Sequence, residues 1–154
     1  MTYKVIIVED DPMVASINNQ YVQKNKRLEV VGIFPNGQQA LEFLKSNPVD
    51  LIILDMYMPM MDGQEFLINL RSRGIQTDVI MVTAANDVRH ITTLLSYGIF
   101  DYLVKPFEFN RFNEALEKGF ITSADGKQQA VVSGTSGFIR LPEGSVVYPV
   151  AVEI

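Results

Sequence analysis

Residues 50–55 read Asp-Leu-Ile-Ile-Leu-Asp, four apolar residues bounded on each side by a carboxylate. An apolar run without polar alternation is typical of a strand that is buried on both faces, as in a parallel sheet covered by helices. The run Asp50–Leu54 therefore predicts an internal strand. Asp55 follows it directly, so its side chain would lie at the carboxyl end of that strand.

Four similar runs flank this stretch at fairly regular spacing. They are Tyr3–Val8, Leu28–Phe34, Val79–Thr83 and Phe100–Val104. The stretches between and after the runs have amphipathic spacing, which favours helices. Strand and helix thus alternate five times by about residue 120, and this pattern predicts a doubly wound α/β domain with a parallel sheet and right-handed crossovers.

Each expected helix has a start signal and an apolar face. The start signals are Asp11-Pro12, Asn36-Gly37, Asp62-Gly63, Asn86 or Asp87, and about Glu108. Helical spacing predicts which side chains share the apolar face of each helix. These are Val14, Ile17 and Tyr21; Ala40, Leu41 and Leu44; Phe66, Leu67 and Leu70; Val88, Ile91, Leu94 and Leu95; and Phe109, Phe112 and Leu116.

Composition excludes several classes of protein. The 154 residues suit one domain, and the net charge of -5 argues against nucleic acid as the direct partner of this segment. No cysteine is present, which excludes disulfides and thiolate metal sites. The apolar runs are too short to span a bilayer, and no signal-peptide pattern opens the chain, so a cytoplasmic protein without membrane contact is expected.

Polar residues stand at the carboxyl ends of four expected strands. The first strand is followed by Glu9-Asp10, the third by Asp55 and the fifth by Lys105, while the fourth ends in Thr83. With strand order 2-1-3-4-5, these ends converge on one cleft at the switch point of the sheet. Crowded carboxylates repel one another, and a hard divalent cation such as Mg²⁺ would relieve that repulsion.

The chemistry that this set supports is phosphoryl transfer to a carboxylate. A metal ion and the ammonium of Lys105 would neutralise charged phosphoryl oxygens, and the hydroxyl of Thr83 would hydrogen-bond another. Asp55 is the best candidate for the nucleophile, since it ends the central strand. Asp11 before Pro12 is better explained as a helix cap.

Several motifs resemble the receiver domain of two-component response regulators, over about residues 1–120. They are Val8-Glu9-Asp10-Asp11-Pro12, residues 55–59 (DMYMP) with Asp62-Gly63, Val82-Thr83-Ala84, and residues 98–106 (GIFDYLVKP). The resemblance implies a flavodoxin-like (CheY-like) receiver fold with a five-stranded parallel sheet. The sequence around Tyr57-Met58 and Lys105-Pro106-Phe107 is similar to that of regulators that respond to citrate or C4-dicarboxylates.

The resemblance also implies roles for individual residues. Asp55 would be the phosphorylation site, and Mg²⁺ (or Mn²⁺) would be held by Glu9, Asp10, Asp55 and the backbone carbonyl of Tyr57. Thr83 would bind a phosphoryl oxygen and reorient. Tyr102 would be the aromatic switch that turns inward with it, and Lys105 would pair with the phosphoryl group. The Lys105-Pro106 bond would be cis.

Partners follow from the same resemblance. A sensor histidine kinase would supply the phosphoryl group, and activation would alter the face of the fourth helix, fifth strand and fifth helix, where a homodimer could form. Such regulators usually control transcription through an appended DNA-binding domain. The predicted receiver covers residues 1–122, and the tail 123–154, with β-prone runs, is too short for such a domain.

Other functional classes are less compatible with these residues. A Mg²⁺-dependent aspartyl-phosphate phosphotransferase needs a second Asp two residues after its nucleophile, where this chain has Tyr57. A flavodoxin-like FMN binder needs a Ser/Thr/Gly loop after the first strand, where Glu9-Asp10-Asp11 would repel phosphate. A degenerate receiver that acts only as an interaction module would not need the complete acidic set with Thr83 and Lys105.

Overall fold

The computed structural model describes residues 2–85 and 91–121. The chain divides into two compact units, residues 1–112 and 113–154, and each is described by itself. The expected cap at Asn86 or Asp87, the apolar residue Val88 and the β-prone runs of the tail lie outside the described residues.

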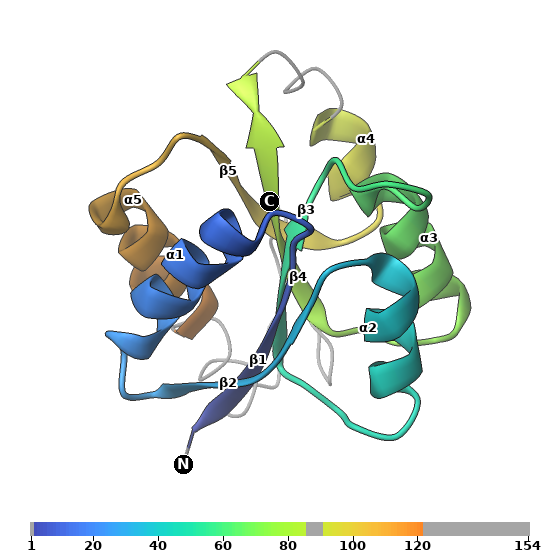
Figure 1. The fold of residues 1–154 in the computed structure, drawn as a ribbon, viewed down its shortest axis with the longest axis horizontal. Coiled ribbons are helices and arrows are strands. Elements are labelled where there is room, and N and C mark those ends of the chain that lie inside the picture. Colours follow the sequence, from blue (N-terminus) through green and yellow to red (C-terminus); the bar gives the residue numbers. More distant parts are fainter. Residues whose placement is uncertain (1, 86–90, 122–154) are drawn as a thin grey trace, which may run out of the picture. The chain divides into compact units, whose positions relative to one another are not determined.

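The first unit contains a five-stranded parallel sheet in the order β2-β1-β3-β4-β5, as predicted (Figure 1). Its strands are β1 (Tyr3–Val8), β2 (Leu28–Phe34), β3 (Leu51–Asp55), β4 (Asp78–Ala84) and β5 (Ile99–Lys105). Every residue of β3 is buried, which confirms that the central apolar run forms an internal strand. The order reverses between β1 and β3, where the carboxyl ends of these two strands lie side by side.

Five helices flank the strands in sequence. They are α1 (Pro12–Gln23), α2 (Gly37–Leu44), α3 (Gly63–Ser72), α4 (Ile91–Leu95) and α5 (Phe109–Glu114). A π-helical segment, Ala115–Ile121, follows α5 where a continuous fifth helix was predicted. Helix α1 lies on one face of the sheet, and α2, α3 and α4 lie on the other (Figure 1). Alternate strand residues such as Ile6, Ile52 and Met81 pack in a single core with these last three helices.

The predicted starts of the first three helices are confirmed by their hydrogen bonds. Asp11 Oδ1 accepts the backbone N–H of Met13 at 2.9 Å, so this carboxylate caps α1. Asn36 caps α2 in the same way through its side chain. Asp62 caps α3 and forms a capping box with Glu65, in which each side chain accepts the other residue's backbone N–H.

The apolar face predicted for α1 is only partly buried, since Val14 and Tyr21 are half-buried. The buried residues of this helix are Ala15, Asn18 and Val22, whereas Ile17 is 41% exposed. The prediction followed apolar spacing, but the residues that the helix buries include a small one and a polar one beside Val22. The apolar faces predicted for α2 and α3 are confirmed, since all six of their named residues are buried.

Within the described residues, no helix combines the length and the apolar character needed to cross a membrane. The longest described helix, α1, has 12 residues, and a membrane span needs about 20.

Candidate phosphoryl-acceptor and metal site

Four charged side chains from three strands meet at the carboxyl edge of the sheet. Glu9 and Asp10 follow β1, Asp55 ends β3 and Lys105 ends β5. Carboxylate oxygens of Glu9, Asp10 and Asp55 lie within 4.8 Å of one another. Nζ of Lys105 lies 2.8 Å from Oδ1 of Asp55 and 3.5 Å from Oε1 of Glu9. The structure therefore brings together four of the residues that the strand-end pattern selected.

These carboxylates differ in how far they are buried. Glu9 is 3% exposed and Asp55 is 4% exposed, while Asp10 is exposed. The backbone N–H of Glu9 donates to the carbonyl of Phe34 on β2, which holds the start of this acidic segment against the sheet. Asp55 thus lies at the base of the site, and Asp10 lies at its solvent side.

Burial has a cost for the charged forms of these side chains. Burial, together with the nearby charge of Asp55, raises the pKa of Glu9 from 4.5 to about 7. Burial also raises the pKa of Asp55, although its hydrogen bond to Lys105 opposes the change. For Lys105, burial lowers the pKa, but the hydrogen bond and charge of Asp55 outweigh this effect and the pKa is raised overall.

The arrangement fits a divalent cation. Three carboxylates face one ammonium, so negative charge remains uncompensated among these groups. Oε1 of Glu9 is buried and makes no hydrogen bond with the described residues. A buried oxygen without a partner is costly unless another ligand satisfies it, and hard oxygen donors in such a cluster are what Mg²⁺ prefers.

Thr83 and Tyr102 lie on neighbouring strands beside this cluster. Thr83 is buried near the end of β4, and its hydroxyl donates to the carbonyl of Ala84 at 3.4 Å. In the ladder Thr83 pairs with Val104, and Tyr102 pairs with Met81, so Thr83 and Tyr102 project from the same face of the sheet. The half-buried ring of Tyr102 packs against the core on the side of α3 and α4.

Tyr57 lies in the loop after β3, two residues beyond Asp55. Its side chain is 50% exposed, and the role predicted for its carbonyl oxygen stays a prediction. The Lys105-Pro106 peptide bond is cis, as predicted.

Sequence reasoning missed the part played by Gly63. A Cβ atom on this first residue of α3 would lie 2.7 Å from the carbonyl oxygen of Asp55 and 2.9 Å from Cα of Met56. The backbone N–H of Gly63 also donates to the carbonyl of Met56. Only glycine permits this approach, which fixes the loop after Asp55. The Asp-Gly pair signalled a helix start, but it could not indicate what the glycine would touch.

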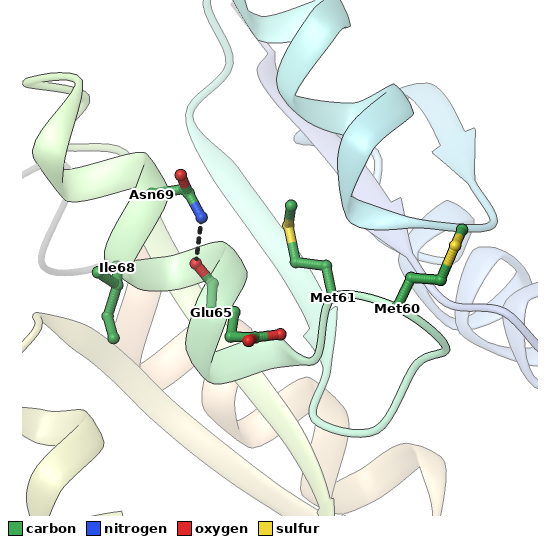
Figure 2. A pocket seen from close by; sticks show the side chains of 5 residues that line it. All are labelled: Met60, Met61, Glu65, Ile68 and Asn69. Atoms are coloured by element: carbon green, nitrogen blue, oxygen red, sulfur yellow. Dashed lines mark hydrogen bonds between the residues drawn. The ribbon is translucent and has the colours of Figure 1, made fainter.

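A surface pocket of about 240 Å³ lies apart from these charges. Figure 2 shows its lining residues, with Met60 and Met61 on the loop before α3 and Glu65, Ile68 and Asn69 on the helix. The amide of Asn69 is already bonded to the carbonyl of Glu65. The pocket has few free polar groups, so the carboxyl edge is the stronger candidate site.

Comparison with known proteins agrees with this geometry. The family model described as "Response regulator receiver domain" matches residues 5–117. This chain belongs to the response regulator receiver domain family. It is therefore a signalling module of two-component regulation.

Several named response regulators are similar to this receiver domain. It is 41% identical over 116 residues to a probable C4-dicarboxylate response regulator, DctR, from Priestia megaterium, covering 75% of this chain and 51% of that protein. It is 46% identical over 112 residues to the transcriptional regulatory protein MalR from Bacillus subtilis, covering 73% and 48%. The chain thus spans about half the length of the curated relatives it matches.

Solved receiver structures have the same fold. The response regulatory domain of mrkE from Klebsiella pneumoniae superposes with a TM-score of 0.73 at 31% identity, covering 82% of this chain and 99% of that one. The receiver domain of a putative Luxo repressor protein from Vibrio parahaemolyticus gives 0.74 at 26% identity, covering 85% and 100%. The CheY-like receiver fold predicted from the sequence is confirmed.

Proposed function

We propose that this receiver domain accepts one phosphoryl group on Asp55 and passes the signal to an output through a change in its α4-β5-α5 face. The observation that carries the proposal is the environment of Asp55. Its carboxylate is buried at the end of the central strand, 2.8 Å from the ammonium of Lys105 and within a cluster of two further carboxylates.

Oxygens of Glu9, Asp10 and Asp55, with the carbonyl of Tyr57, would hold Mg²⁺ or Mn²⁺. When bound, the ion would supply positive charge that offsets the carboxylates and the phosphoryl oxygens. Oε1 of Glu9 supports this assignment, because it makes no hydrogen bond with the described residues and has Nζ of Lys105 at 3.5 Å; the ion, or a water bound to it, would satisfy that oxygen.

In the transfer step, a carboxylate oxygen of Asp55 attacks the phosphorus of the donor. The bond between phosphorus and the donor's leaving atom breaks, and its electron pair stays with the leaving atom. The ammonium of Lys105, which lies 2.8 Å from Oδ1 of Asp55, would neutralise one phosphoryl oxygen, and the hydroxyl of Thr83 would hydrogen-bond another after it reorients. No proton need leave Asp55, since its ionised form is the nucleophile.

Thr83 and Tyr102 would carry the response to the surface. Both side chains project from one face of adjacent strands, so a turn of Thr83 toward a phosphoryl oxygen would open space next to the packing of Tyr102. A phosphoryl group can shift the equilibrium between two arrangements only because it interacts more favourably with one of them. A homodimer through α4, β5 and α5 is one form that the response could take.

The donor would be a cognate sensor histidine kinase, and the setting would be the cytoplasm. Relatives named as C4-dicarboxylate response regulators suggest that the upstream signal belongs to that chemical class. Relatives named as transcriptional regulators suggest that the output is transcription, with DNA bound by a separate output domain. The receiver itself would contact neither DNA nor membrane, and its limits are proposed as residues 1–122.

Phosphoryl labelling tests the proposal. With acetyl phosphate and Mg²⁺, we expect the wild-type protein to gain the mass of one phosphoryl group, and we expect Asp55→Asn to gain none. Asp50→Asn is the matched control, because Asp50 precedes the same strand at its other end and accepts the backbone N–H of Lys4. Labelling that persists in Asp55→Asn, measured by intact mass, would disprove the site.

A further inference from the structure

Four aromatic rings form a cluster between α1 and the chain segment that follows Lys105. The ring of Tyr21 on α1 lies 6.2 Å from Phe107, 5.5 Å from Phe109 and 5.4 Å from Phe112, measured between centroids. Phe107 and Phe112 are stacked at 6.0 Å with an interplanar angle of 9°. We refer to these four residues as the aromatic cluster. Tyr21 is the member that all three phenylalanines contact.

A cation extends this cluster. Nζ of Lys24, at the end of α1, lies 4.4 Å from the ring centroid of Phe109 and 5.9 Å from that of Tyr21. An ammonium at this distance is attracted by the electron-rich ring face. Lys24, the C-cap residue of α1, therefore adds a second contact between this end of the helix and Phe109.

The aromatic cluster joins the two segments that carry the charges of the site. Helix α1 begins directly after Glu9, Asp10 and the capping residue Asp11. Phe107 is the second residue after Lys105. The ammonium of Lys105, on the second of these segments, lies 2.8 Å from Asp55 and 3.5 Å from Glu9.

The chain that leaves Lys105 is restrained by contacts to β5 and to α1. Lys105 is the last residue of β5, which among the described residues is an edge strand paired with β4. The final pair of that ladder is Ala84 with Lys105. Beyond this pair, Arg111 bonds back to Asp101 and to the carbonyl of Tyr102 on β5, and the rings of residues 107, 109 and 112 contact Tyr21 on α1.

We propose that Tyr21 is a positioning residue for phosphoryl transfer, which acts through Lys105 by holding the segment after β5 against α1. This inference rests on the proposed function of Asp55 as the acceptor. Tyr21 itself touches neither Asp55 nor the donor in this role. Loss of its ring frees the segment, and the Lys105 ammonium then spends less time where the charge of the transferring phosphoryl group develops.

A double-mutant cycle tests the proposal with acetyl phosphate and Mg²⁺. The oxygen of Asp55 attacks phosphorus, the bond from phosphorus to the acetyl oxygen breaks, and acetate leaves with the electron pair. We expect Tyr21→Ala to slow labelling about tenfold, since small misplacements of a catalytic group have effects of that order or larger. We expect the same substitution to have no further effect in a Lys105→Ala background.

Two controls separate positioning from general loosening. Tyr21→Phe keeps the ring and is expected to label at the wild-type rate. Phe43→Ala removes a comparable ring contact elsewhere, with Phe34 at 5.0 Å, and is also expected to label normally. Thermal denaturation confirms that each variant is folded. If Tyr21→Ala does not fold, Tyr21→Leu keeps the apolar volume and enters the same comparisons.

The possible results distinguish failure of the positioning role from failure of the proposed function. The positioning role would be overturned if Tyr21→Ala slowed labelling equally in both backgrounds, if folded Tyr21→Ala (or Tyr21→Leu in its place) labelled at the wild-type rate, or if Phe43→Ala slowed labelling equally. If Lys105→Ala labels too slowly to follow, the labelling rates of Tyr21→Ala and Phe43→Ala still test the positioning role. Absence of labelling in the wild-type protein would instead overturn the proposed function.

Discussion

Two charged sites lie at opposite edges of the same sheet, and they differ in how well their polar atoms are satisfied. At the amino edge, the guanidinium of Arg71 donates to four backbone carbonyls, those of Tyr97, Ile75, Thr77 and Gly98, at 2.7 to 3.0 Å. At the carboxyl edge, Glu9 and Asp55 are buried beside Asp10, with Lys105 as their ammonium partner. Each site was assembled from segments far apart in the sequence.

The difference fits a structural role for Arg71 and the proposed phosphoryl-acceptor role for the carboxyl edge. Arg71 ties the end of α3 to the loops that enter β4 and β5, and its planar fork matches the carbonyls around it. Gly98 has a φ of +85°, and a Cβ there would lie 3.2 Å from Nη2 of Arg71, so this loop is shaped around the guanidinium. At the carboxyl edge, a buried oxygen of Glu9 makes no hydrogen bond with the described residues and the pKa of Glu9 is raised, which is typical of a ligand-binding site.

The largest effect is expected where the satisfied site is broken. Arg71→Ala would remove four charge-assisted hydrogen bonds and leave their carbonyls short of donors, at a cost of roughly 3 to 4 kcal/mol in the free energy of unfolding. Urea denaturation would measure the change from the midpoint at constant slope. Arg73→Ala is the matched control, because Arg73 is exposed near the same helix end and its loss should change stability by less than about 0.5 kcal/mol. Similar losses in the two variants would contradict the structural role of Arg71.

A smaller effect is expected at the carboxyl edge without metal, where a rise in pH lowers the stability of the folded protein. The folded protein binds the proton of Glu9 more tightly than the unfolded chain does, because its pKa rises from 4.5 to about 7. Stability from this group is therefore complete below pH 4.5 and is lost as the pH rises through about 7, by roughly 2 to 3 kcal/mol.

Glu9→Gln isolates that contribution, since glutamine is neutral at every pH. With a chelator present, the wild-type protein should lose stability relative to Glu9→Gln as the pH rises from 5 to 8. Urea denaturation at each pH would measure this difference. Glu42→Gln, at an exposed carboxylate on α2, should give a profile parallel to that of the wild type. A parallel profile for Glu9→Gln as well would remove the argument that burial disfavours its charge.

The smallest of the three effects is expected when the carboxyl edge is filled. At pH 7.5, Mg²⁺ at ten times its Kd should stabilise the wild-type protein by about 1.4 kcal/mol, since the folded state alone would bind it. Glu9→Gln combined with Asp10→Asn should abolish most of this gain and weaken Mg²⁺ binding in calorimetry. Asp11→Asn should keep the gain, because asparagine can still cap α1. An unchanged response in the double variant would remove both carboxylates from the metal site.

Much of the sheet was predictable from local patterns. The limits of β1 and β2 were predicted without error, and those of the other three strands were predicted to within one residue at each end. Parallel strands buried on both faces have apolar runs that are visible in one sequence. Helix α1 was harder, because Asn18 is buried and Ile17 is exposed, and hydrophobic spacing alone cannot anticipate a buried polar residue.

The candidate site was predictable in its residue types but not in its interactions. Position at strand ends was enough to select Glu9, Asp10, Asp55, Thr83 and Lys105, because parallel strands present their carboxyl ends at one edge. No local sequence pattern could show that Gly63 packs on the carbonyl of Asp55. Nor could it show that Tyr21 contacts three phenylalanines that are remote from it in the sequence. Those contacts depend on crossovers that place distant segments side by side.

The sequence by itself determined the alternation of strand and helix, the caps of the first three helices and the set of acidic, hydroxyl and ammonium groups at the strand ends, since these follow from residue type and spacing. Only the tertiary structure decided that Glu9 and Asp55 are buried while Asp10 is exposed, and that Lys105 reaches Asp55 across 50 residues of chain. The physical reason is that the pKa of a carboxylate depends on the solvent and charges around it, and packing between remote segments sets both.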